Sequence, residues 1–206
     1  MRTEETVQLI THDLGDACLF HIGRLPDDLV WDDTTFESAW GMHPDEYHEI
    51  MIHGRLVKTP RWQQAYGADY HYTGRVNRAL PVPPLLEPLF AWARQALDRR
   101  LNGLLLNWYD SDLGHYIGAH RDSTENMVEG APIVTVSFGE ERNFRLRPWK
   151  GKGYQNFPAT HGSVFVMPWA TNLNFTHEIP KVARHQGRRI SVTLRAFTTG
   201  VVEASA

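Results

Sequence analysis

His120, Asp122 and His177 have the residue types and the spacing of a metal-binding set. In an extended segment, residues two apart point to the same side, so His120 and Asp122 can hold one ion together. A histidine from a later strand would complete two histidines and one carboxylate on one face of an octahedron. Non-haem Fe(II) oxygenases use this set and keep three positions open for a co-substrate and oxygen. A His-x-Asp pattern alone arises easily by chance in a chain with 11 histidines, so its weight depends on the surrounding residues.

Polar and apolar side chains alternate strictly along segment 189–195, which predicts a strand with one polar face. The polar positions are Arg189, Ser191, Thr193 and Arg195. Two arginines facing the inside of a barrel are costly unless they meet an anion. A dicarboxylate bound at the metal would give each planar guanidinium a carboxylate partner. The alternative is a solvated strand face with both arginines in water. Upstream, Asn107 and Tyr109 alternate in the same way and offer an amide and a phenol on one face.

The spacing of apolar residues predicts the elements that position these side chains. Pro84 suits a helix start, and the apolar residues after it recur at a period near 3.6, so residues 84–101 are expected to form an amphipathic helix. Six later segments are rich in β-branched or aromatic residues and are expected to be strands. They are 103–109, 132–138, 143–147, 162–167, 174–177 and 189–197. This order indicates an α+β protein with a C-terminal antiparallel barrel or double-sheet roll.

The first part of the chain has weaker signals. Residues 17–22 are expected to form a short strand, and 26–44 a helix and a loop. Segments 46–52 and 60–66 are expected to be extended, with a turn at His53-Gly54-Arg55 between them. We find no internal repeats or long linkers, so residues 1–206 are expected to form a single domain.

Composition and charge restrict the class of protein. Of the 206 residues, 42% are hydrophobic and 22% charged, which is typical of a globular domain. No apolar run reaches the roughly 18 residues of a membrane span, and the acidic, polar start has no features of a signal peptide. The single cysteine, Cys18, cannot form an internal disulfide. We therefore expect an intracellular protein, cytoplasmic or, in a eukaryote, nuclear.

The two parts of the chain differ in charge. Residues 1–50 carry a net charge of −10, residues 51–206 carry +7, and residues 51–100 alone carry +5. The basic part suggests a surface that faces a polyanion, and the alternative is a solvated basic face. The overall pI near 6.4 argues against a strong non-specific DNA binder.

Together these elements resemble the AlkB family of Fe(II)/2-oxoglutarate-dependent dioxygenases, which remove alkyl groups from nucleic-acid bases. The resemblance covers residues 50–198. It rests on Asn107-Trp-Tyr109, Ile117-Gly-Ala-His120-Arg-Asp122, 132–139, Arg142-Asn-Phe144, His161-Gly-Ser163, His177 and 189–195. Three further segments are similar to the nucleotide-recognition lid of the DNA-repair branch. They are Pro60-Arg61, Ala65-Tyr66-Gly67 and Tyr70-His-Tyr72-Thr-Gly74.

The resemblance implies a double-stranded β-helix core, jelly-roll or cupin-like, with N-terminal helices and a nucleotide-recognition lid. The chain would then divide into an acidic N-terminal extension (1–50), the substrate lid (51–83), a supporting helix (84–101) and the oxygenase β-core (102–198).

The resemblance also implies cofactor roles, with the histidine–aspartate–histidine set binding Fe(II) and 2-oxoglutarate acting as co-substrate with O2. Arg189 would pair with the distal carboxylate of 2-oxoglutarate, helped by Tyr109 and Ser191. Arg195 and Asn107 would lie beside the carboxylate at the metal.

For the substrate, the resemblance implies methylated nucleic acid. Tyr72 would stack on the flipped base, while Tyr70 and Arg61 would hold the strand by stacking and phosphate contact. Two positions depart from the family pattern. Thr124 stands where many relatives have an acidic residue that reads the base, and His53 stands where some have a bulky apolar wedge. Because a weaker wedge makes duplex opening less favourable, we expect single strands to be preferred. We also expect the protein to be a monomer and not to bind a membrane.

Two other functions stay open. The same oxygenase chemistry could act on a small molecule or a protein side chain, or the barrel could bind a metal or nucleic acid without catalysis. The basic, aromatic lid favours nucleic acid over a small molecule. A complete metal set beside a strand with two arginines disfavours a binding module, which has no need of both.

Overall fold

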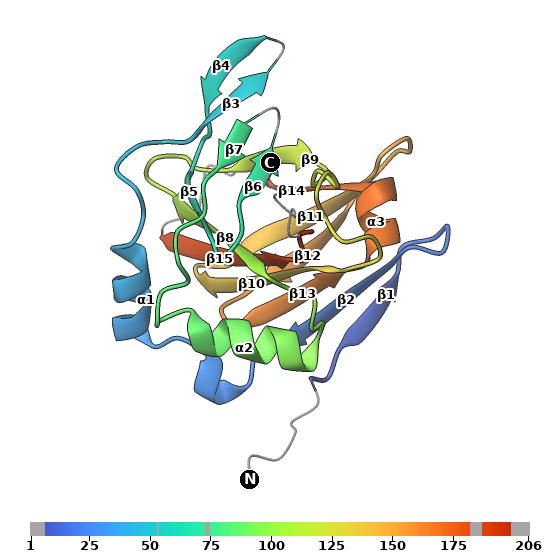
Figure 1. Ribbon diagram of the computed structural model, residues 1–206. Coiled ribbons are helices and arrows are strands. Elements are labelled where there is room, and N and C mark those ends of the chain that lie inside the picture. Colours follow the sequence, from blue (N-terminus) through green and yellow to red (C-terminus); the bar gives the residue numbers. More distant parts are fainter. Residues whose placement is uncertain (1–6, 53, 73–74, 182–186, 199–206) are drawn as a thin grey trace, which may run out of the picture.

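The structure, a computed structural model, describes residues 7–52, 54–72, 75–181 and 187–198. Its α-helices are α1 (Asp33–Trp40), α2 (Glu87–Ala96) and α3 (Trp169–Asn174), and a short 3-10 helix covers Asp27–Leu29. Figure 1 shows two sheets, with α2 lying along the larger one and α3 at the other side of the molecule. None of the helices in the described ranges is long and apolar enough to cross a membrane.

All neighbouring strands in the two sheets are antiparallel. The larger sheet consists, in spatial order, of β1 (Ile10–Asp13), β2 (Leu19–Arg24), β13 (Ser163–Met167), β10 (Ile133–Gly139), β15 (Arg188–Arg195), β8 (Gly103–Asp110) and β5 (Trp62–Tyr66). The smaller sheet consists of β12 (Gln155–Ala159), β11 (Arg142–Pro148), β14 (Phe175–Ile179) and β9 (Ile117–His120). Two hairpins complete the fold, β3 (Glu49–Ile52) with β4 (Arg55–Lys58), and β6 (Tyr70–Tyr72) with β7 (Arg75–Asn77). The expected jelly-roll core is confirmed.

Strand β8 shows why the larger sheet lies in the middle of the molecule. Its even-numbered residues from Leu104 to Trp108 join a core that includes Leu89 and Ala93 of α2. Of its odd-numbered residues, Leu105 and Tyr109 join a second core, with residues of the smaller sheet. Because side chains alternate along a strand, one apolar segment supplies both layers. Each buried leucine contributes about 1.5–3 kcal/mol to stability, so β8 anchors helix, sheet and interior together.

The six strands expected after the helix are all present, with ends that differ by at most two residues. The helix itself is shorter than expected, 87–96 instead of 84–101. Its N-terminal side is a turn closed by a hydrogen bond from Leu86 N–H to Pro83 O, so Pro84 precedes the helix. At the other end, the Asp98 carboxylate accepts a hydrogen bond from Arg100 N–H and forms a local turn. Such a turn competes with further helical bonds.

The described part of segment 1–50 belongs to the sheet and the core. Strand β2 pairs with β13 over four residues, and Phe20 of β2 is fully buried. The expected strand 17–22 lies two residues later, at 19–24, because Asp16 and Ala17 form a turn with positive φ. Strand β4 was not expected, because the sequence indicated a turn at 53–55 and no strand directly after it. Strands β1, β9 and β12 and helix α3 were also not expected; each has four to six residues.

Candidate active site

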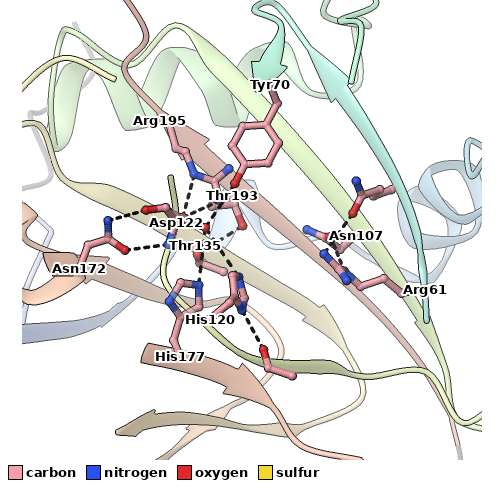
Figure 2. A network of polar contacts seen from close by, with 12 residues as sticks. Arg61, Tyr70, Asn107, His120, Asp122, Thr135, Asn172, His177, Thr193 and Arg195 are labelled. Carbon is pink, nitrogen blue, oxygen red and sulfur yellow. Dashed lines mark hydrogen bonds and ion pairs between the residues drawn. The ribbon is translucent and has the colours of Figure 1, made fainter. Parts of the chain in front are cut away.

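His120, Asp122 and His177 come together between the two sheets, from β9, the loop after it, and β14 (Figure 2). His120 is the last residue of β9 and lies opposite His177 in the ladder. The Nε2 atoms of His120 and His177 are 3.7 and 3.9 Å from Oδ1 of Asp122. One ligand atom from each residue lies within 4.8 Å of the others. The structure thus unites three residues that are up to 57 positions apart in the sequence.

The two histidines are in the state that metal binding needs. The carbonyl oxygen of Gly118 lies 2.9 Å from Nδ1 of His120, so this nitrogen carries the proton and Nε2 presents its lone pair to the cluster. Burial lowers the pKa of His120. Burial, together with the nearby His120, lowers the pKa of His177 to about 3. Both imidazoles are therefore neutral at neutral pH, and only a neutral imidazole can bind a metal.

The two oxygens of Asp122 have different partners. Oδ1 faces the imidazoles and lies 3.4 Å from the hydroxyl of Tyr70, which donates to it. Oδ2 accepts hydrogen bonds from Nε (2.8 Å) and Nη2 (2.6 Å) of Arg195. Burial alone would raise the pKa of this carboxyl, but the charge and the hydrogen bonds of Arg195 hold it far below its usual range. Asp122 is thus a fixed carboxylate with one oxygen directed at the metal position. Arg195, which we expected beside the co-substrate, lies on this metal ligand.

Arg189 lies in the same cavity, whose volume is about 520 Å³ counted to its open mouth. Its side chain is fully buried, which excludes the solvated strand face that the sequence left open. Nε donates to Ser137 Oγ at 2.9 Å, and the guanidinium carbon lies 5.0 Å from the centroid of the Tyr109 ring. Neither terminal nitrogen of Arg189 has a hydrogen-bond partner among the described residues. Burial lowers the pKa of this group.

This arrangement fits both groups that the sequence implied. Two neutral imidazoles and one carboxylate oxygen are the donor set of a non-haem Fe(II) site. A buried guanidinium with two unused NH2 groups is costly unless an anion completes it, and a carboxylate matches its planar fork. Polar residues along the rest of the cavity include the charged Arg61 and Glu178 and the uncharged Gln63, Asn107, Thr135, Ser191 and Thr193. The cavity can therefore hold a metal and a carboxylate ligand side by side.

The lid residues that the structure describes lie deeper than we expected. Arg61 is 5% exposed and donates to Asn107 Oδ1 at 2.7 Å and to Gln63 Oε1 at 3.1 Å. Tyr70 is 4% exposed, and its ring lies 4.6 Å from the guanidinium carbon of Arg195. Both residues line the cavity, and their expected contacts with a phosphate or a base stay predictions. Arg61 directly precedes β5, which forms the edge of the larger sheet beside β8, and Tyr70 begins β6.

Three other expected substrate residues are less defined. Thr124 is half-buried in the loop after Asp122 and is not among the residues that line the cavity. Tyr72 ends strand β6, but its side chain lies outside what the structure describes. His53 lies outside the described residues. Their roles stay predictions.

The sequence analysis missed Asn172, Ser137 and Thr135. Ser137 and Thr135 could have been found, because they alternate with valines on β10 in the same manner as the polar residues of β15. Asn172 carries no such signal, since it belongs to a short helix without a repeating pattern.

Comparisons with known proteins agree with this geometry. Residues 34–195 match the model of the 2OG-Fe(II) oxygenase superfamily. The human protein named DNA oxidative demethylase ALKBH2 is 29% identical over 157 residues, which cover 71% of this chain and 60% of that protein. The Arabidopsis thaliana protein of the same name is 33% identical over 219 residues, and the match covers 90% of this chain and 68% of that protein. The solved structure of OsALKBH1 superposes with a TM-score of 0.54 at 12% identity, covering 90% of this chain and 99% of that one. The chain spans less than two thirds of the length of the mammalian relatives.

Proposed function

Because the chain belongs to the 2OG-Fe(II) oxygenase superfamily, and within it to the AlkB-like family, we propose that it oxidatively removes alkyl groups from N-alkylated bases of DNA or RNA. The observation that carries the proposal is a single cavity that contains both the three metal-binding side chains and Arg189 with its unused donors. The substrate class is extended from relatives whose names describe DNA oxidative demethylases.

In this proposal the chain binds, orients and shields the reactants. Bound Fe(II) would supply, with 2-oxoglutarate and O2, the oxidation of an N-methyl carbon that ends in succinate, CO2, formaldehyde and the unmethylated base. Nε2 of His120, Oδ1 of Asp122 and Nε2 of His177 would hold the metal. Arg189 would bind the far carboxylate of 2-oxoglutarate, and Arg195 would keep Asp122 ionised and oriented. Apolar walls exclude water; they include Leu105, Ile117, Phe144 and Ile179.

The β3–β4 hairpin supports nucleic acid as the substrate. It projects from the body of the molecule (Figure 1) and carries the exposed basic residues Arg55 and Lys58. It also exposes Met51 and Leu56, which lie opposite each other in the ladder. Cations next to exposed apolar side chains suit a strand that presents both phosphates and unstacked bases.

We further propose that single strands are preferred and that the protein acts as a monomer. His53, which lies between β3 and β4 in the sequence, is a poor apolar wedge by its residue type, and flipping a base out of a duplex costs a few kcal/mol. The test is formaldehyde and succinate release over a panel of methylated oligonucleotides, each offered single- and double-stranded. Faster turnover of the duplexes would contradict the preference for single strands. It would favour the exposed Met51 and Leu56 as the apolar wedge in place of His53. Release of succinate without turnover of any methylated strand would instead favour a small-molecule or protein substrate.

Replacing Tyr72 with alanine should lower turnover of methylated single strands by roughly 5- to 150-fold, because stacking of one base on an aromatic ring contributes about 1–3 kcal/mol. Uncoupled decarboxylation of 2-oxoglutarate should stay nearly unchanged, since the substitution spares the metal position. The two rates are measured as formaldehyde and succinate release from the same samples. Equal activity of Tyr72→Ala and wild type on single strands would argue against the stacking role.

A further inference from the structure

Asn172 of helix α3 holds the backbone of Asp122 from both sides (Figure 2). The N–H of Asp122 donates to Asn172 Oδ1 at 3.0 Å, and Nδ2 of Asn172 donates to the carbonyl oxygen of Asp122 at 3.1 Å. The Asn172 side chain is 1% exposed, so water does not compete for either bond. A single amide thus satisfies both polar backbone groups of one candidate metal ligand.

Asp122 depends on this support because no strand holds it. The paired part of β9 ends at His120, and residues 121–124 have no regular secondary structure. Arg195 of the larger sheet donates a hydrogen bond to the side-chain oxygen Oδ2 of Asp122. Without a fixed backbone, that ion pair could rotate the carboxylate and move Oδ1 away from the imidazoles.

Hydrogen bonds hold helix α3 in place, so the helix can fix the position of the loop that follows β9. The hydroxyl of Thr171 donates to the carbonyl oxygen of Leu19 on β2 at 2.6 Å, and Thr171 is fully buried. Nη1 of Arg121 donates to the carbonyl oxygen of Leu173 at 2.8 Å, which adds a third hydrogen bond between the loop and the helix. Helix α3 also leads directly into β14, which carries His177.

We propose that Asn172 is a positioning residue that sets the distance between Asp122 and His177 in the metal site. It would act through the backbone of Asp122 and touch neither metal nor substrate. The inference rests on the metal site of the proposed function but not on its substrate. Outer-shell groups that orient metal ligands typically change metal affinity by 10- to 100-fold when they are removed.

The test is a titration of the metal-free, full-length protein with Co(II), followed by its visible absorption, in wild type, Asn172→Ala and Asn174→Ala. We expect Asn172→Ala to bind one Co(II) with an affinity about 10- to 100-fold lower than wild type. Asn174→Ala is the matched control, because Asn174 lies in the same helix but is exposed, and among the described residues its side chain bonds only to the carbonyl oxygen of Ala170. Its affinity should equal that of wild type.

Hydrogen exchange gives a readout that does not depend on a metal. The amide of Asp122 should be protected in metal-free wild type and Asn174→Ala, and it should exchange fast in Asn172→Ala. Asn172→Ser serves as a second variant if the alanine variant does not fold, because its shorter side chain stays polar but cannot reach both backbone groups. Unchanged Co(II) affinity in a folded Asn172 variant would overturn the proposal. So would unchanged protection of the Asp122 amide.

These outcomes are separable from the proposed function. If wild type binds Co(II) and loses it on Asn172 substitution but turns over no methylated strand, the positioning role stands and only the substrate assignment fails. If wild type binds no Co(II), the metal site and the role of Asn172 fail together.

Discussion

Replacing His120 with alanine should abolish decarboxylation of 2-oxoglutarate and leave the fold intact. His120 supplies one of three ligands, so the loss should exceed the roughly 100-fold that removal of an outer-shell partner can cause. Its side chain is 17% exposed, and its removal leaves no buried ion unpaired. We therefore expect the melting temperature of the metal-free protein to stay near that of wild type. Succinate release and a circular-dichroism melt of the same preparation measure both effects.

A matched control for this substitution is His21→Ala. His21 lies on β2, bonded to Thr11 of the neighbouring strand and outside the lining of the cavity. Decarboxylation in this variant should equal that of wild type. Decarboxylation at the wild-type rate in His120→Ala would refute the assignment of His120 as a metal ligand.

Asp122→Ala is a weaker test of the same site. The structure shows that removal of Asp122 leaves the guanidinium of Arg195 buried without its carboxylate. Breaking a buried pair in this way typically costs about 3–5 kcal/mol. Loss of activity in Asp122→Ala would therefore mix loss of a ligand with loss of stability, whereas His120→Ala separates the two.

Local alternation explains why the core could be predicted from the sequence. The polar positions of β15, from Arg189 to Arg195, differ from their apolar neighbours at every second residue, so both the strand and its cavity face could be expected. The metal set could be proposed because His120 and Asp122 are two residues apart. His177 is far from both residues in the sequence, so its position beside them follows only from the pairing of β14 with β9.

What could not be predicted depends on contacts between distant segments. The burial of Arg61 could not be predicted, because it depends on a hydrogen bond to Asn107 of β8, which lies 46 positions away in the chain. The contact of Arg195 with Asp122 could not be predicted for a similar reason, since no local pattern shows that these two residues meet, and its expected place beside the co-substrate stays a prediction. Helix α3 has six residues, fewer than two turns, and so lacks the apolar repeat that identifies a helix.

Arg189→Ala should weaken binding of 2-oxoglutarate by at least 100-fold. Truncating one partner of a buried charge pair costs about 3–5 kcal/mol, and each 1.4 kcal/mol is a factor of ten in affinity. Arg188→Ala is the control, because Arg188 precedes it on β15 but pairs with Glu37 of α1. The apparent dissociation constant from succinate release should rise only in Arg189→Ala. A shift of less than about threefold would show that β15 does not bind the co-substrate.

The stability of the ligand-free variant distinguishes a binding residue from a structural one. In the structure, the guanidinium of Arg189 has two buried NH2 groups without partners among the described residues, and such groups destabilise the folded state. Replacing Arg189 with alanine should therefore change the melting temperature of the ligand-free protein little. Wild type at 100 times its dissociation constant should gain about 2.7 kcal/mol from 2-oxoglutarate, and Arg189→Ala at the same concentration should gain almost nothing. If Arg189 were structural, the order would reverse: the ligand-free variant would melt early, and 2-oxoglutarate would still stabilise it.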